Sequence, residues 1–157
     1  MNAVKFLLSH GHVDKNRIAA MGLSVGCYRT WRLAALAPEI KAGVAICWMA
    51  TIKGLMVPLN NMTRGSSAYT MIHPGLPAYM DYPDIASVAC PKPMLFYNGI
   101  QDTLFPVPCV EEAYEKMRRV WRSRNAGEKL ITKLWDVPHE YSLEMQEESF
   151  DWLDTVI

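Results

Sequence analysis

The five residues at positions 22–26 read Gly-Leu-Ser-Val-Gly, and they lie between an apolar run at 18–21 and a predicted helix over 28–36. A serine at the apex of a strand-to-helix turn has a tight backbone, and we expect both flanking glycines to let the two elements pass closely. The Ser24 hydroxyl would then project from the carboxyl end of a strand, and the Val25 amide would point a donor at the same spot from a helix N-terminus. The segment therefore predicts a nucleophile beside one half of an oxyanion hole.

The five-residue pattern alone is a weak signal, because it arises by chance in about one chain of this length in twenty. Its context strengthens it, since the strand before it and the helix after it are predicted from hydrophobic periodicity and not from the motif. The alternative interpretation is a glycine-rich turn with an ordinary surface serine at position 24.

The composition predicts one globular domain over residues 1–157. Half of the residues are apolar and a fifth are charged, and the 16 basic residues balance the 16 acidic ones. This balance favours neither nucleic acid nor an anionic membrane as a partner. No apolar run approaches the roughly 20 residues that cross a bilayer, and residues 1–8 become polar too soon for a secretory signal. We therefore expect a soluble chain.

The four cysteines are scattered without the spacing of a metal site or of a disulfide framework. We expect free thiols at Cys27, Cys47, Cys90 and Cys109, and the sequence predicts neither a metal nor a cofactor. His139 precedes Glu140, but no second histidine follows at the spacing of a zinc helix.

Strands and helices alternate along the chain, which predicts an α/β fold with about four parallel strands flanked by helices. The predicted strands are 18–21, 42–48, 94–98 and 129–135, and the predicted helices are 3–9, 28–36, 110–121 and about 143–156.

Residues 51–93 form a long excursion with turn signals and no sustained period, and we expect short helices near 78–81 and 85–89. Loops of this length usually carry function. This one leaves the sheet at the same edge as Ser24, so it could cover the site and bind substrate with Trp48, His73 and Tyr79. Alternatively, it only covers a hydrophobic face.

Three side chains each follow the carboxyl end of a different predicted strand: Ser24, Asp102 and His139. In α/β sheets ligands bind at this edge. An imidazole with a pKa near 6.5 can accept the proton of a serine, and a carboxylate can orient that ring and stabilise its cation. The chain order Ser, Asp, His is that of the α/β hydrolases.

Two members of this triad have competitors. Asp136 lies three residues before His139 and could replace Asp102, although Gly99 and Pro106 bracket Asp102 in a tight turn. His139 could also be an ordinary loop histidine.

The sequence resembles the α/β-hydrolase superfamily and, more narrowly, the dienelactone-hydrolase-like carbohydrate esterases, the group containing acetyl xylan esterases. The resemblance runs over nearly the whole chain and rests on 22–26, 14–18, 93–102 with Pro106, Pro138 with His139, and Trp152 with Leu153. It implies hydrolysis of small acyl esters or deacetylation of sugars, with Ser24 as the nucleophile, His139 as the base, Asp102 as the orienting acid and no cofactor.

The sequence departs from the superfamily in that only about twenty residues precede Ser24, where several strands are usual. The chain thus resembles the C-terminal half of a hydrolase, and the loop that supplies the second oxyanion donor has no counterpart. Losing one such donor costs about 10² to 10³ in turnover. The nucleophile strand would also become an exposed apolar edge. We expect either a part of a larger enzyme or a homo-oligomer formed through that edge.

Two other functions compete with an esterase. A serine peptidase of the prolyl-oligopeptidase type would share the triad, although the bulky aromatics usual around that nucleophile are missing at Leu23 and Val25. The other is a catalytically impaired half-domain that acts only in assembly.

Overall fold

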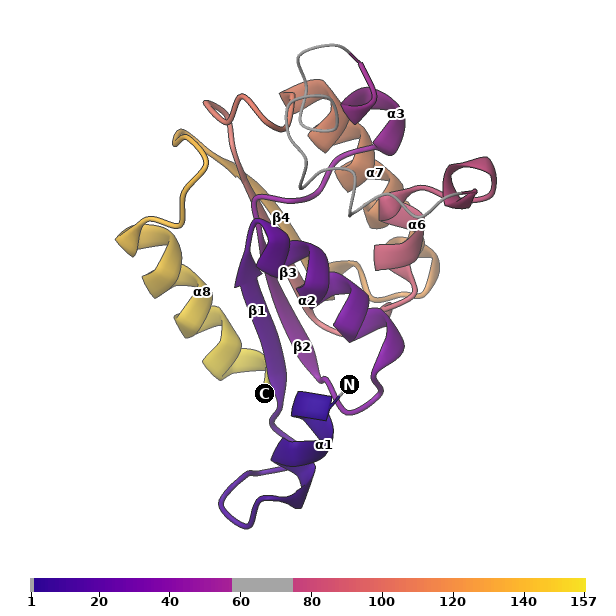
Figure 1. Cartoon of the computed structure of the whole chain (residues 1–157). Helices are drawn as coiled ribbons and strands as arrows, with labels where there is room; N and C mark the ends of the chain where they lie inside the picture. The colour runs from indigo at the N-terminus through magenta and orange to yellow at the C-terminus, as the bar shows by residue number, and fades with distance from the viewer. Residues whose placement is uncertain (1, 58–74) are drawn as a thin grey trace.

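The computed structural model describes residues 2–57 and 75–157 and contains a parallel four-stranded sheet with the order β1-β2-β3-β4. The strands are β1 (Ala19–Leu23), β2 (Ala42–Ile46), β3 (Met94–Gly99) and β4 (Leu130–Trp135). The predicted α/β fold with four parallel strands is confirmed, and all four carboxyl ends lie at one edge of the sheet (Figure 1).

Helices cover both faces of this sheet (Figure 1). The helical elements are α1 (Asn2–Ser9), α2 (Val25–Leu36), α3 (Ile52–Leu55), η1 (Leu76–Ala78), α6 (Tyr82–Ser87), α7 (Val107–Ser123), η2 (Gly127–Lys129) and α8 (Leu143–Val156). The α2, α6 and α7 helices lie on one face, and α8 lies on the other. In the described ranges, no helix has the length and apolar character needed to span a membrane.

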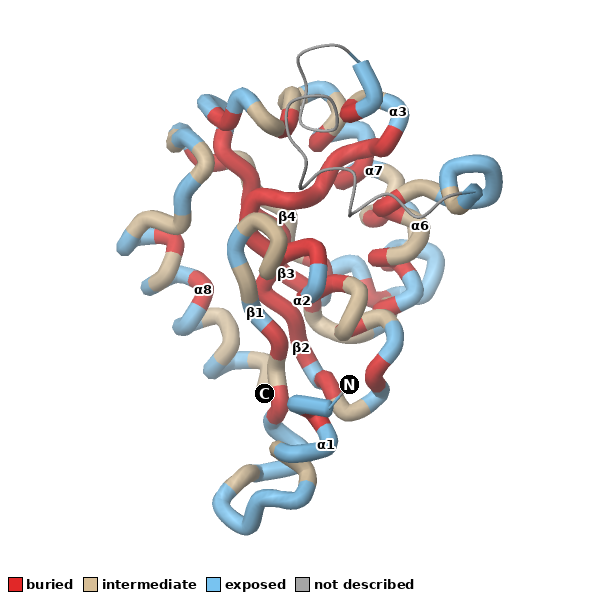
Figure 2. Tube along the Cα trace, in the orientation of Figure 1, coloured by how far each residue is buried: buried red, intermediate tan, exposed pale blue. Residues whose placement is uncertain are grey.

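The core is divided by the sheet, because successive strand residues face opposite sides. In β3, Met94 and Phe96 pack under α2 and α7, whereas Leu95 and Tyr97 face α8. All residues of β2 and β3 are buried (Figure 2). Burial on both faces explains why these two strands carry apolar residues at successive positions and not only at alternate ones.

The α8 helix buries few of its side chains against the sheet, since Met145 and Ser149 are its only buried residues. Polar contacts supplement this packing. Glu148 accepts hydrogen bonds from the Tyr97 hydroxyl and, at 2.6 Å, from Lys133 Nζ. That ammonium group also lies 3.5 Å from the centre of the Trp135 ring.

The β1 strand lies at the edge of the sheet, as predicted. The Lys41 N–H donates to the Ile18 carbonyl, and the Ser24 N–H donates to the Ile46 carbonyl, each at 2.8 Å. Because backbone groups alternate in direction along a strand, the N–H and C=O groups of residues 19, 21 and 23 point away from β2.

Apolar side chains accompany this open backbone edge. Met21 is 42% exposed and Leu23 is 39% exposed. A hollow of about 350 Å³ lies beside Met21, and residues of α1, β1 and α2 line most of it. The four cysteines are free, as predicted.

The contacts of Glu148 predict a pH-dependent contribution to stability. Burial raises the pKa of Glu148, but the hydrogen bonds from Lys133 and Tyr97 outweigh it and lower the pKa below its ordinary value. A carboxylate with a lowered folded-state pKa stabilises the fold above its unfolded pKa of about 4.3, and this contribution is lost as the pH falls through the folded-state pKa. We expect Glu148→Gln to lower the unfolding free energy at pH 7 by about 0.5 to 1 kcal/mol, because solvent screens this half-exposed group.

Urea denaturation at pH 7 and below pH 4 measures this effect, and Glu147→Gln on the exposed side of α8 is the matched control. The difference between Glu148→Gln and the parent should shrink at the lower pH. A difference that is equal at both values, or equal to that of Glu147→Gln, would contradict the linkage.

Candidate active site

Ser24 joins β1 to α2 in a strained backbone conformation, with φ 57° and ψ −118°. A residue other than glycine in such a region costs of order 1–3 kcal/mol and persists only where its surroundings impose it. Here the Ser24 N–H donates to Ile46 O at 2.8 Å, and the Ser24 carbonyl accepts from Tyr28 N–H at 3.1 Å. The serine is thus attached on one side to β2 and on the other to the first turn of α2.

The glycines on either side of this turn have unequal roles. A Cβ atom on Gly22 would lie 2.5 to 2.8 Å from backbone atoms of Gly26, so it would overlap them. A Cβ atom on Gly26 would meet nothing within 4 Å. The expectation that both positions must lack a side chain is therefore wrong for Gly26, because only Gly22 faces the opposing backbone.

Val25 is the first residue of α2, which starts three residues earlier than predicted. The amides in the first turn of a helix have no acceptor within that helix, and the positive end of the helix dipole lies there. The Val25 N–H is therefore at the end of α2 that favours negative charge.

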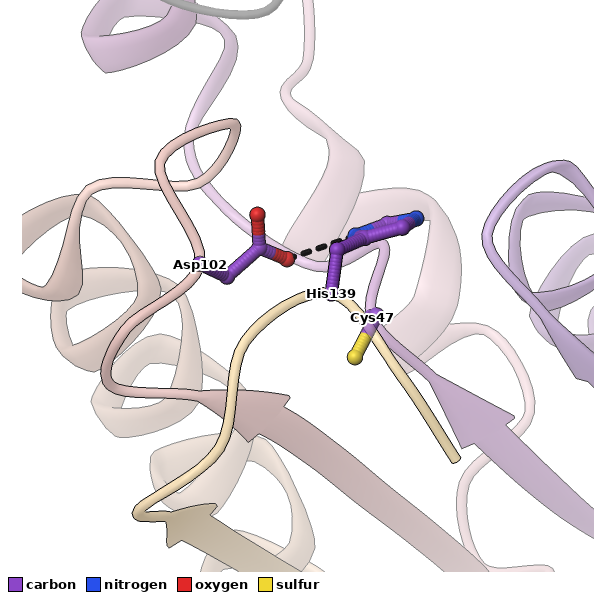
Figure 3. Close-up of side chains that lie close together, drawn as sticks. All are labelled: Cys47, Asp102 and His139. Carbon is purple, nitrogen blue, oxygen red and sulfur yellow. Dashed lines mark hydrogen bonds and ion pairs between the residues drawn. The ribbon is translucent and has the colours of Figure 1, made fainter. Parts of the chain in front are cut away.

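Asp102 and His139 are in direct contact beyond the ends of β3 and β4 (Figure 3). His139 Nδ1 lies 2.7 Å from Asp102 Oδ2, and the Asp102 carboxylate is fully buried. Its other oxygen accepts the Leu104 N–H at 2.9 Å. The competitor Asp136 instead accepts from Gln101 Nε2 at 3.0 Å. The structure thus places Asp102, and not Asp136, against His139.

The loop that carries His139 lies over the end of β3. The Gln101 N–H donates to Val137 O at 3.1 Å, and a Cβ atom on Gly99 would overlap that same carbonyl oxygen. The His139 ring stacks on Phe105, with 6.0 Å between ring centres and 15° between planes. Its side chain is 26% exposed. A buried carboxylate, an aromatic ring and a tight loop therefore orient the imidazole.

Of the three predicted substrate-binding residues, the structure brings Trp48 near this pair. Its ring contacts Tyr28 at 5.7 Å and Phe105 at 5.2 Å between centres. Trp48 is 3% exposed, and its Nε1 donor has no hydrogen-bond partner among the described residues. Tyr79 follows η1 and is 87% exposed. His73 lies outside the described residues.

Sequence reasoning missed Cys47, which follows β2 with φ 54° and donates its N–H to Tyr97 O at 2.7 Å. Its thiol lies close to Asp102 and His139 (Figure 3). Burial, and then the nearby charge of Asp102, raise the pKa of the Cys47 thiol to about 12. The thiol is therefore protonated at neutral pH, which makes it a poor nucleophile. Cys47 could have been selected from the sequence, because it follows the carboxyl end of a strand, as the three residues of the predicted triad do.

Ser24 and the Asp102–His139 pair follow the carboxyl ends of β1, β3 and β4, so they share one edge of the sheet. Within residues 2–57 and 75–157, no hydrogen bond joins the Ser24 hydroxyl to His139. A strained serine and an acid–base pair at this edge of a parallel sheet are the arrangement of the α/β-hydrolase fold.

Comparisons with known proteins agree with this class. The chain is similar to a glucuronoyl esterase of carbohydrate esterase family 15 from Caldicellulosiruptor kristjansonii, with a TM-score of 0.81, 12% identity and 99% of this chain covered. It is also similar to the methylesterase BT1017, with a TM-score of 0.76, 18% identity and 99% of this chain covered. These similarities establish a shared fold. No protein-family model matches the sequence.

In sequence, the chain is similar to YtaP, a Bacillus subtilis (strain 168) protein named as a hydrolase, with 26% identity over 128 residues. This match covers 82% of the chain and 42% of YtaP. The two structural matches cover 48% of the glucuronoyl esterase and 33% of the methylesterase. The chain therefore spans less than half the length of each of these proteins.

The turn at Ser24 yields a stability prediction with a built-in control. We expect Gly22→Ala to lower the unfolding free energy by about 2 to 3 kcal/mol, because its Cβ would overlap the Gly26 backbone. Gly26→Ala should be neutral or stabilise by up to about 1 kcal/mol, since alanine favours the helix and meets open space. Urea denaturation followed by circular dichroism measures both, and equal effects would contradict the one-sided contact.

Proposed function

We propose that this chain provides the catalytic residues of a serine esterase that hydrolyses short-chain acyl esters, including acetyl esters of carbohydrates. The names of the similar proteins support this reaction class, since they include a hydrolase, a glucuronoyl esterase and a methylesterase. Ser24 is the proposed nucleophile, His139 the base and Asp102 the orienting acid.

The observation that carries the proposal is the 2.7 Å contact between His139 Nδ1 and Asp102 Oδ2. A proton on Nδ1 that is donated to this buried carboxylate leaves the lone pair of Nε2 available. His139 Nε2 then accepts the Ser24 proton as the serine oxygen attacks the ester carbonyl carbon. His139 then gives this proton to the leaving alcohol. In the second half of the reaction, His139 accepts a proton from a water molecule as the water attacks the acylated serine, and the carboxylic acid is released.

The Val25 N–H is the proposed donor to the oxyanion that forms in each step, because it lies at the N-terminus of α2. No hydrogen bond joins the Ser24 hydroxyl to the His139 ring in the described ranges. Such contacts are often long in free enzymes and tighten when substrate binds. Trp48 is a proposed substrate contact, since its buried indole N–H would gain an acceptor. His73 and Tyr79 stay predictions.

Fluorophosphonate labelling followed by intact-mass measurement tests the nucleophile. We expect a single adduct on the parent chain and none on Ser24→Ala, because an activated serine attacks the phosphorus of the probe and displaces fluoride to form a phosphonate ester. Cys47→Ala should keep the adduct, since the protonated Cys47 thiol is not the proposed nucleophile. An adduct that persists in Ser24→Ala would disprove the assignment. No adduct on the parent would favour the impaired half-domain.

Parallel assays on p-nitrophenyl acetate and on a dipeptide anilide separate an esterase from a serine peptidase. An esterase should hydrolyse the acetate, and the Ser24→Ala substitution should abolish this activity. Comparable turnover of the anilide would favour a serine peptidase of the prolyl-oligopeptidase type.

We also propose that the open edge of β1 pairs with a second copy of the chain. Antiparallel pairing about Met21 would hydrogen-bond the outward N–H and C=O groups of residues 19, 21 and 23 with their two-fold mates. The same contact would cover the exposed side chains of Met21 and Leu23. Covering the edge in this way removes a template for uncontrolled strand pairing.

Gel filtration at micromolar concentration tests this pairing. The parent should elute as a dimer, and Met21→Lys should elute as a monomer because a charged side chain at the edge opposes pairing. Leu143→Lys, at a position on α8 that is 69% exposed, is the matched control and should remain a dimer. A monomeric parent would overturn the proposed pairing. It would favour the alternative that this chain is a part of a larger enzyme.

A further inference from the structure

Three side chains from the ends of three adjacent strands converge beside the acid–base pair. Cys47 follows β2, Asp102 follows β3 and His139 follows β4 (Figure 3). One ligating atom of each side chain lies within 4.8 Å of the other two. Their donors are a sulfur, a carboxylate oxygen and an imidazole nitrogen.

This donor set is the one that zinc prefers. Zn²⁺ binds cysteine sulfur at about 2.3 Å, histidine nitrogen at about 2.0 Å and carboxylate oxygen at about 2.0 to 2.2 Å, in a tetrahedral arrangement. Donors on one ion are then roughly 3.3 to 3.7 Å apart. The observed separations, 2.7 Å between Asp102 and His139 and up to 4.8 Å in the group, bracket that range. Shifts of about 1 Å would bring the three donors to these separations, and a water molecule would take the fourth position of the tetrahedron.

Two of the three donors are held in place from outside the group. The Cys47 backbone is attached to β3 through Tyr97 O at 2.7 Å, and Asp102 Oδ1 accepts the Leu104 N–H at 2.9 Å. His139 is the partly exposed member, at 26%, so its side of the group faces the solvent. An incoming ion would therefore meet the imidazole first and two positioned donors behind it.

We propose that Cys47, Asp102 and His139 bind a zinc-like divalent cation, and that this cation reversibly blocks the hydrolase site. Binding releases the thiol proton of Cys47 to the solvent and leaves a thiolate on the metal. His139 binds through Nδ1, so its proton moves to Nε2. An Nε2 that carries a proton cannot accept the proton of Ser24, which is why the bound cation inhibits. The inhibitory part of this inference rests on the proposed esterase function, whereas the binding part does not.

A cadmium titration of the full chain tests the binding part without any substrate. Cd²⁺ serves as the probe because its bond to a thiolate produces an ultraviolet charge-transfer band. We expect a band that saturates at one ion per chain, that disappears in Cys47→Ala, and that needs at least about tenfold more Cd²⁺ in His139→Ala. Cys109→Ala should retain the parent titration, since that thiol lies outside the group.

Cys47→Ser keeps the size of the side chain and is a second variant in case Cys47→Ala does not fold. Persistence of the saturable band in either folded Cys47 variant would overturn the site, as would a parent chain without such a band.

The inhibitory part is tested with p-nitrophenyl acetate, each variant being compared with its own metal-free rate. Micromolar Zn²⁺ should lower kcat/KM of the parent at least about tenfold, chelation should restore it, and Cys47→Ala should lose this sensitivity. Cadmium binding without inhibition by Zn²⁺ would overturn the blocking role alone. A parent without esterase activity would instead contradict the proposed function and leave the cadmium result to decide the site.

Discussion

The backbone contact between Gly22 and Gly26 is the constraint on which the site depends. It lets β1 end and α2 begin within one residue, and that reversal places Ser24 at φ 57°. Hydrogen bonds to Ile46 and Tyr28 attach the strained residue to both elements. The position of Ser24, the Val25 amide and the packing of α2 on the sheet are therefore consequences of one close approach, and a single methyl group at position 22 would disturb them together.

Much of this architecture could be predicted because its signals are local. The apolar runs of β2 and β3 reflect burial on both faces of a parallel sheet, and the periodicity of α7 reflects one buried stripe. The rule that functional residues follow strand ends selected both Asp102 and His139, which are in contact in the structure. Gly99 and Pro106 favoured Asp102 over Asp136 in the sequence, and it is Asp102 whose carboxylate contacts His139.

The remaining features depend on contacts between residues far apart in the chain, which periodicity does not encode. Phe105 stacks on His139, and the Trp48 ring lies against Phe105. Cys47 joins the acid–base pair only because β2 and β3 are neighbours in the sheet. The unequal roles of Gly22 and Gly26 follow from which backbone faces which, and a symmetric sequence pattern gives no sign of that.

The weak attachment of α8 has a consequence for His139, the proposed base. Few buried side chains tie α8 to the sheet, so it should belong to the part of the fold that opens first, with faster amide hydrogen exchange than β2 and β3. Its N-cap, Ser142, is only three residues from His139. Fraying of this helix would therefore loosen the loop that orients the imidazole while the serine turn, on the opposite edge strand, stays intact. Loss of the proposed esterase activity on heating would then precede global melting, because the two halves of the proposed proton relay belong to units of different local stability.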